Sequence, residues 1–279
     1  MAEAEKVRAA RKILPTDELM GQAAARDVGR VLRRLTAEEG KPVMANFAGA
    51  PSQDTFLAAL CAEEGIAWER VQAVHLDEYF DLPPGHPNTV GLYLREHLFD
   101  RVPIPEGNVH YVKDVAGEDP AGLAKAYGSV LREVLASVRS GGGEYVACIG
   151  IGVNGHIAYN EPHVDKRAGE MVLPVGIEDV SVQQQYDDYK HHPDPAARHG
   201  SLSEVPRRAV TVSCAGILAA DRIFCMVPGR HKAEAVRAMW DGPVTDALPA
   251  SLLRTHRRMT LYLDEASASL LDRGPVLVV

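Results

Sequence analysis

The stretch YVACIGIGVNGHIAYNEP (residues 145–162) decides the fold class, because it joins an apolar run to a glycine-rich loop. Its first six residues are apolar or small and do not alternate with polar ones, which predicts a strand covered on both faces. The residues that follow, including Asn154, His156 and Glu161, are typical of a loop. Ligands of open parallel sheets bind where such loops follow the strands. The stretch therefore predicts an α/β sheet with a site at the carboxyl end of this strand.

Similar apolar runs recur along the chain and alternate with segments of helical spacing. The runs lie at 43–47, 71–76, 209–213, 222–227, 259–263 and 275–279, and the helical patterns lie at 55–64, 89–99, 121–139 and 231–240. This alternation predicts a mainly parallel, Rossmann-like sheet with helices on both faces. We expect a single domain over residues 1–279, with a charged N-terminal helical segment at 1–40 and a loop insertion at 187–200.

Composition argues against several classes of partner. The chain has 38 acidic and 30 basic residues and a net charge of −8, whereas nucleic acids and anionic membranes need a concentrated positive surface. The four cysteines form no C-x-x-C pair, and the N-terminus carries no apolar segment of signal length. We therefore expect a cytoplasmic protein without a nucleic-acid or membrane partner. No metal is expected, since His191, His192 and His199 form only a weak candidate set.

The glycine-rich loop carries the strongest chemical signal. Gly150, Gly152 and Gly155 allow tight turns and close approach of the backbone to a ligand. Beside Asn154 and Glu161, His156 has polar partners that can set its tautomer for acid–base work. The alternative is a plain turn whose histidine caps a helix. A dinucleotide cofactor is not expected, because no acidic residue ends a strand about twenty residues later.

A second signal is LDEYF (76–80), in which two carboxylates end an apolar strand. In strand geometry Asp77 and Glu78 point to opposite sides, so one of them can face a cleft. A carboxylate in a partly desolvated cleft gains basicity and can move a proton between adjacent carbons. The alternative is an ordinary acid that caps a turn.

Together, LDEYF and GIGVNGHIAYNEP closely resemble the glucosamine-6-phosphate deaminase (isomerase) family, whose superfamily also contains the 6-phosphogluconolactonases. The further segments that resemble the family are HPNTVGLYLREHLFDRVPIPEGNVH (86–110), VPRRAVTVSCAGILAADRI (205–223), GRHKAEAV (229–236) and PASLLRTHRRMTLYLDEAS (249–267). The lactonases share a glycine–histidine loop but usually lack both the D-E-Y form and the N-E-P ending. The resemblance covers most of the chain and implies a parallel, Rossmann-like fold.

The resemblance also implies roles for individual residues. The histidine that matches His156 helps to open the sugar ring, and the aspartate that matches Asp77 moves a proton between C2 and C1 before ammonia leaves. The glutamate that matches Glu161 pairs with the histidine, and Asn154 belongs to the same catalytic group. The substrate contacts that we expect are Gly49, Ala50, Ser52, Glu78, Gly155 and Lys232.

Three positions depart from the family pattern. Asn154 stands where many members have aspartate, which removes a negative charge near His156. The first loop, at 47–51, reads F-A-G-A-P and lacks the hydroxyl groups of the family's S-G-S-T-P turn. Glutamines at 183–185 occupy the region of a phosphate-binding arginine, whereas Lys232 matches the family's phosphate lysine. Arg198 or Arg254 would have to supply the missing charge.

The predicted activity is that of an amino-sugar aldose–ketose isomerase and deaminase. Its partner is a small sugar or sugar phosphate, and a homo-oligomer is compatible with the sequence. We hypothesise an altered amino sugar or ketose that is unphosphorylated or carries its anion elsewhere, and the family implies the ordinary 6-phosphate as the alternative. Two rivals are a lactonase-type hydrolase on the same fold and a non-catalytic sugar-binding protein. The set Asp77, His156 and Glu161 argues against the binding protein, which would not need it.

Overall fold

The computed structural model describes residues 9–192 and 194–271 of the chain. Its centre is a seven-stranded sheet in the order β1-β10-β9-β6-β2-β3-β5, in which every pair of neighbouring strands is parallel. The strands are β1 (Ala10–Leu14), β2 (Val43–Phe47), β3 (Val71–His75), β5 (Val109–His110), β6 (Glu144–Ile149), β9 (Arg222–Val227) and β10 (Met259–Asp264). The predicted α/β fold with a mainly parallel sheet is confirmed.

Helices cover both faces of this sheet, because the side chains of each strand alternate between two apolar cores. In β2, Val43, Ala45 and Phe47 belong to one core, and Met44 belongs to the other. The first core is completed by α1 (Asp17–Arg33), α2 (Asp54–Cys61) and α3 (Val90–His97). The second is completed by α4 (Pro120–Ser140), α6 (Cys214–Leu218) and α7 (Ala233–Asp241). The fully apolar strands seen in the sequence are therefore the strands buried between two helical layers.

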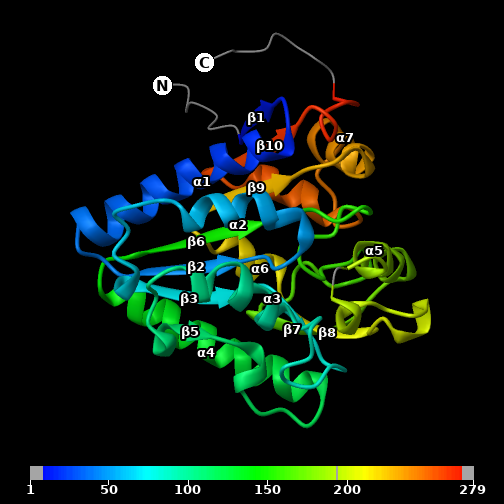
Figure 1. Ribbon diagram of the computed structural model, residues 1–279, viewed down its shortest axis with the longest axis horizontal. Helices are drawn as coiled ribbons and strands as arrows, with labels where there is room; N and C mark the ends of the chain where they lie inside the picture. The colour runs from blue at the N-terminus through cyan, green and yellow to red at the C-terminus, as the bar shows by residue number, and fades with distance from the viewer. Residues whose placement is uncertain (1–8, 193, 272–279) are drawn as a thin grey trace.

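A smaller antiparallel sheet adjoins the carboxyl ends of the main strands. It has the order β4-β8-β7 and contains β4 (Asp77–Tyr79), β7 (Val172–Gly176) and β8 (Arg208–Val212). Strand β4 follows β3 after one residue, so it carries the chain out of the main sheet. Figure 1 shows β7, β8 and helix α5 (Asp179–Tyr189) to the right, beyond one end of the main sheet. The apolar run predicted at 209–213 thus forms a strand of this second sheet.

Two expectations about the organisation of the chain need correction. Helix α1 lies within the segment 1–40 that was expected to be helical, but residues 10–14 of that segment form strand β1 at the edge of the main sheet, where it pairs with β10. This strand is largely exposed, so it lacks the apolar run of the central strands. The expected loop at 187–200 begins with the last residues of α5 and contains a 3-10 turn at Pro195–Ala197. The run at 275–279 lies outside the described residues.

The carboxyl ends of β2, β3, β6 and β9 lie next to one another in the sheet. The loops that follow them carry the four segments singled out in the sequence, at 48–53, 76–80, 150–162 and 229–236. In the described residues no helix is both long and apolar enough to cross a lipid bilayer.

Candidate active site

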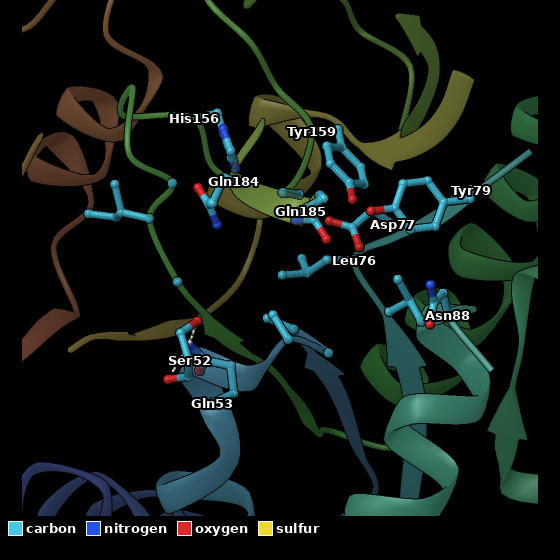
Figure 2. A pocket seen from close by; sticks show the side chains of 18 of the residues that line it. Ser52, Gln53, Leu76, Asp77, Tyr79, Asn88, His156, Tyr159, Gln184 and Gln185 are labelled. Atoms are coloured by element: carbon cyan, nitrogen blue, oxygen red, sulfur yellow. Dashed lines mark hydrogen bonds between the residues drawn. The ribbon is translucent and has the colours of Figure 1, made fainter. Parts of the chain in front are cut away.

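One pocket collects residues from all of these loops. Its walls come from 48–53 after β2, 76–79 after β3, 150–159 after β6, the helix α5 and Lys232 after β9. Figure 2 shows the side chains of Asp77, His156 and Gln184 around this pocket, with Ser52 and Gln53 on another wall. Residues that are far apart in the sequence are brought together because parallel strands end at the same edge of the sheet.

The imidazole of His156 is held in one orientation by its neighbours. The backbone N–H of His156 donates to Oδ1 of Asn154 at 3.1 Å, which identifies that atom as the amide oxygen. The same oxygen lies 2.8 Å from Nδ1 of His156, and Ser181 Oγ lies 3.0 Å from Nδ1. Because Asn154 Oδ1 can only accept, these contacts favour a proton on Nδ1 and leave Nε2 as the basic nitrogen.

Gly152 makes room for this ring. A Cβ atom at position 152 would lie 2.1 Å from Cε1 and 2.2 Å from Nε2 of His156. Any side chain at this position would displace the imidazole. The second glycine of the loop is therefore required by the packing of the histidine.

Glu161 is fully buried behind the histidine and reaches it through Asn154. The Nδ2 atom of Asn154 donates to Oε2 of Glu161 at 2.7 Å, while the same carboxylate oxygen lies 3.6 Å from Nδ1 of His156. Burial would raise the pKa of Glu161, but the contacts with His156, Ser181 and Asn154 outweigh burial and lower it. The predicted pairing of Glu161 with His156 thus takes the form of a buried three-residue group with Asn154 as the bridge.

Asp77 lies in the same pocket, at the carboxyl end of β3. Its side chain is half-buried, and Figure 2 shows its carboxylate next to the phenol groups of Tyr79 and Tyr159. Burial, together with the neighbouring charge of Glu78, raises the pKa of Asp77 to about 7. A carboxylate with this pKa can both take up and release a proton near neutral pH.

Glu78 points away from the pocket. Its carboxylate accepts hydrogen bonds from the backbone N–H groups of Tyr79, Val90 and Gly91 at 2.9, 3.1 and 3.0 Å. Burial raises the pKa of Glu78 to about 7, against the effect of these hydrogen bonds. Glu78 was expected to contact the substrate, but its carboxylate lies at the start of α3, on the opposite side of the strand from Asp77.

The remaining predicted contacts divide into two groups. Gly49, Ala50, Ser52 and Lys232 line the pocket. Gly155 does not line it, and its backbone, at φ +82°, packs so closely on Leu248 that a Cβ would lie 2.2 Å from that side chain. Gly155 therefore shapes the loop and does not touch the substrate space.

The two arginines considered as sources of charge are directed elsewhere. Arg254 Nη1 donates to the carbonyl oxygens of Met239 and Gly242, at 3.3 and 2.5 Å, and Arg198 Nε donates to the carbonyl of His192 at 2.6 Å. Neither arginine lines the pocket. His199, considered as a metal ligand, has Nε2 3.0 Å from Nδ2 of Asn88.

Several pocket residues carry no signal that would identify them in the sequence. Asn88, Tyr159 and Tyr189 line the pocket. Tyr159 lies inside the recognised motif, but its neighbours give no reason to single it out. Asn88 and Tyr189 reach the pocket only because the loop before α3 and the end of α5 fold against it.

Comparison with known proteins agrees with this architecture. Residues 15–176 match the family model of glucosamine-6-phosphate isomerases/6-phosphogluconolactonase, which is more than half of the chain. The chain belongs to this family. Within the glucosamine-6-phosphate isomerase/6-phosphogluconolactonase family, it is similar to the glucosamine-6-phosphate deaminase of Rhodopirellula baltica, with 30% identity over 94% of this chain and 96% of the relative. The glucosamine-6-phosphate deaminase of Halothermothrix orenii is 34% identical over 77% of this chain and 81% of the relative.

Solved structures of the glucosamine-6-phosphate isomerase/6-phosphogluconolactonase family share the fold. A monomeric glucosamine-6-phosphate deaminase superposes with a TM-score of 0.77 and 25% identity, and covers 94% of this chain and 99% of that protein. The 6-phosphogluconolactonase of Trypanosoma brucei superposes with a TM-score of 0.71 and 17% identity, over 95% of this chain and 99% of that protein. At 17% identity, the similarity to the Trypanosoma brucei protein supports only a shared fold.

Proposed function

We propose that the protein isomerises and deaminates an amino sugar, with water, to a ketose and ammonia. The observation that carries the proposal is that Asp77 and His156, from the ends of different strands, line one pocket. The relatives named as glucosamine-6-phosphate deaminases support the reaction class. A base for a carbon-bound proton and a second acid–base group for the ring oxygen are the two functions that such a reaction needs.

His156 serves the first step, the opening of the sugar ring. With its proton on Nδ1, the imidazole presents Nε2, which takes the proton of the C1 hydroxyl and passes it to the ring oxygen of the sugar as the bond between that oxygen and C1 breaks. The products of this step are a C1 aldehyde and a hydroxyl at C5. Glu161 stabilises the positively charged imidazole, because its carboxylate lies 3.6 Å from Nδ1.

Asp77 serves the second step, the movement of a proton from C2 to C1. Its carboxylate takes the C2 proton, and the electron pair of the C2–H bond forms a C1–C2 double bond while the C1 oxygen takes a proton from the solvent. The intermediate has a hydroxyl on C1 and the amino group on C2. Asp77, which exchanges part of its protons with the solvent, then protonates C1 and leaves an iminium group at C2. Water adds to C2 and returns one proton to the solvent, and ammonia leaves, so that one water is consumed for each ammonia and ketose formed. A pKa near 7 suits a carboxylate that must first take up a proton and then release one.

The test is a stoichiometric assay on the purified full-length chain with amino sugars. We expect ammonia and the ketose to appear in equal amounts, and deuterium from heavy water to enter C1 of the product. A lactonase would release a sugar acid from a sugar lactone without ammonia. Such a result, with no ammonia from any amino sugar, would reject the proposed reaction.

A further inference from the structure

Strand β4, which carries Asp77, lies at the edge of the small sheet with β8 beside it, and in the described residues no strand pairs with its other edge. The backbone bonds to β8 are made by the carbonyl of Leu76, at 2.7 Å, and the N–H of Phe80, at 2.9 Å. In an antiparallel pair the hydrogen-bonded residues alternate along the strand. The carbonyl groups of Asp77 and Tyr79 therefore point away from β8, towards the open edge of β4.

His75, the last residue of β3, binds the first of these two carbonyl groups. Its Nδ1 lies 2.9 Å from the carbonyl oxygen of Asp77, and because this oxygen can only accept, Nδ1 carries the proton. Its Nε2 accepts from the backbone N–H of Val112 at 3.0 Å, and the side chain is fully buried. Burial lowers the pKa of His75 to about 4, so the ring is neutral near pH 7. Backbone groups thus occupy both of its nitrogens.

The backbone of His75 is held in turn by Tyr127 of helix α4. The N–H of His75 donates to the hydroxyl oxygen of Tyr127 at 3.0 Å, and the same hydroxyl lies 3.1 Å from the carbonyl oxygen of His75. The two rings pack with 5.7 Å between their centroids. His75 is therefore a rigid support, because its ring cannot turn without leaving buried polar groups unpaired.

Lys113, which follows β5, binds the second carbonyl group. Its Nζ donates to the carbonyl oxygens of Tyr79 at 2.5 Å, Leu82 at 2.6 Å and Phe80 at 3.3 Å. An ammonium group has three N–H donors, so these contacts use all of them. Lys113 thus fixes the chain immediately after Asp77, on the same open edge of β4.

We propose that His75 and Lys113 are positioning residues, which hold Asp77 in place for proton transfer at carbon. The inference rests on the proposed function, in which Asp77 takes the C2 proton. Neither His75 nor Lys113 lines the pocket, so each acts through the backbone of β4. A shift of about 1 Å in a reacting group can cost about 100-fold in rate. Ring opening uses His156 from another loop and does not depend on this edge.

Two amide substitutions separate the two contacts of the His75 ring, since each amide can replace one ring nitrogen. His75→Asn can place its Nδ2 donor at the position of Nδ1 and so keep the bond to Asp77. His75→Gln can place its Oε1 acceptor at the position of Nε2, which keeps the bond to Val112 but loses the donor to Asp77. Each variant gives up one buried hydrogen bond, so the two should unfold at similar urea concentrations.

The assay uses the full-length chain with glucosamine 6-phosphate and with glucosamine. We expect His75→Gln to lower both kcat and the exchange of the C2 proton with heavy water about 10–100-fold, with KM changed by less than about twofold. His75→Asn should stay within about threefold of the unmodified chain. Enzyme-catalysed interconversion of the two anomers, followed by NMR, needs ring opening but no transfer of the C2 proton. It should be the same in both variants.

Lys113→Met tests the second contact without a change in the core, because the lysine is half-buried. We expect kcat and C2 exchange to fall about tenfold, while anomer interconversion is unchanged. Lys125→Met is the matched control, since Lys125 is exposed on α4.

The inference is overturned by equal C2 exchange in His75→Gln and His75→Asn. It is also overturned if anomer interconversion falls by the same factor as C2 exchange, because the loss would then be one of general structure. Should neither His75 variant fold, turnover in Lys113→Met equal to that of Lys125→Met would overturn it. Ammonia release by the unmodified chain keeps the proposed function standing in each of these cases. Absence of ammonia from both sugars with the unmodified chain would reject the proposed function, and the inference with it.

Discussion

The carboxylate of Glu161 lies 3.6 Å from Nδ1 of His156, and the amide of Asn154 makes the hydrogen bonds that join the two residues. An amide suits this position because it can accept from the histidine and donate to the carboxylate. An aspartate in its place would face Glu161 with a second carboxylate, and the two would have to share a proton. The asparagine therefore keeps Glu161 ionised and the histidine oriented.

Replacing Glu161 by glutamine tests this arrangement. Glu161→Gln should lower kcat about tenfold, because the positive imidazole loses its buried counter-charge. KM should change by less than about twofold, since Glu161 does not line the pocket. Steady-state kinetics on amino sugars separate the two constants. Glu178→Gln removes a carboxylate that pairs with His163 at 2.8 Å on the surface, and it should alter neither constant. An equal loss of kcat in both variants would contradict the role of Glu161.

Asp77→Asn tests the carbon-proton step. The asparagine cannot accept the C2 proton, so turnover should fall by about 10²–10⁴-fold while sugar binding persists. Exchange of the C2 proton with heavy water, followed by NMR, should stop as well. Near-normal exchange in this variant would show that another group removes the proton.

The same substitution should stabilise the protein at neutral and higher pH. The pKa of Asp77 is raised in the folded chain to about 7 from 3.8, so the folded state binds more protons than the unfolded state between these values. Stability that is present below pH 4 is thus lost as the pH rises towards 7. Asp77→Asn should remove this loss and gain about 1–3 kcal/mol at pH 8, with no gain at pH 4.

Urea denaturation of both chains at pH 4, 6 and 8 measures this difference. Asp100→Asn is the surface control, because the side chain of Asp100 is 59% exposed. A gain that is independent of pH would show that burial of the Asp77 charge is not its cause.

Gly152→Ala should abolish the orientation of His156 without unfolding the protein. The new methyl group would overlap the imidazole, with 2.1 Å to Cε1, so the ring must turn away from Asn154. We expect kcat to fall about 100-fold or more, as a misplacement of about 1 Å can cost that factor. The control is Gly176→Ala, because an added Cβ at Gly176 meets no atom within 4 Å. Turnover in Gly152→Ala equal to that of the control would refute the packing argument.

Most strands of the central sheet and the loops after them could be predicted from local sequence patterns. The apolar strands of the central sheet and the loops after them follow from spacing, since strand and helix periods are short-range properties of the chain. The edge strand β1 was missed for the same reason, because an exposed strand such as Ala10–Leu14 carries no continuous apolar pattern. Its place was decided by pairing with β10, from the other end of the chain.

The sequence by itself determined the α/β class, and it predicted a site made by the loops after the strands with the group Asp77, His156 and Glu161. Only the tertiary structure decided that Asn154 bridges the histidine and the glutamate, that Glu78 caps the start of α3, and that Ser181 contacts His156. The physical reason is that side-chain direction and charge at a site depend on which loops meet across neighbouring strands. Asn154, in the loop after β6, and Ser181, in α5, lie 2.8 and 3.0 Å from Nδ1 of His156, so no local pattern in either element reveals that both hold the same imidazole.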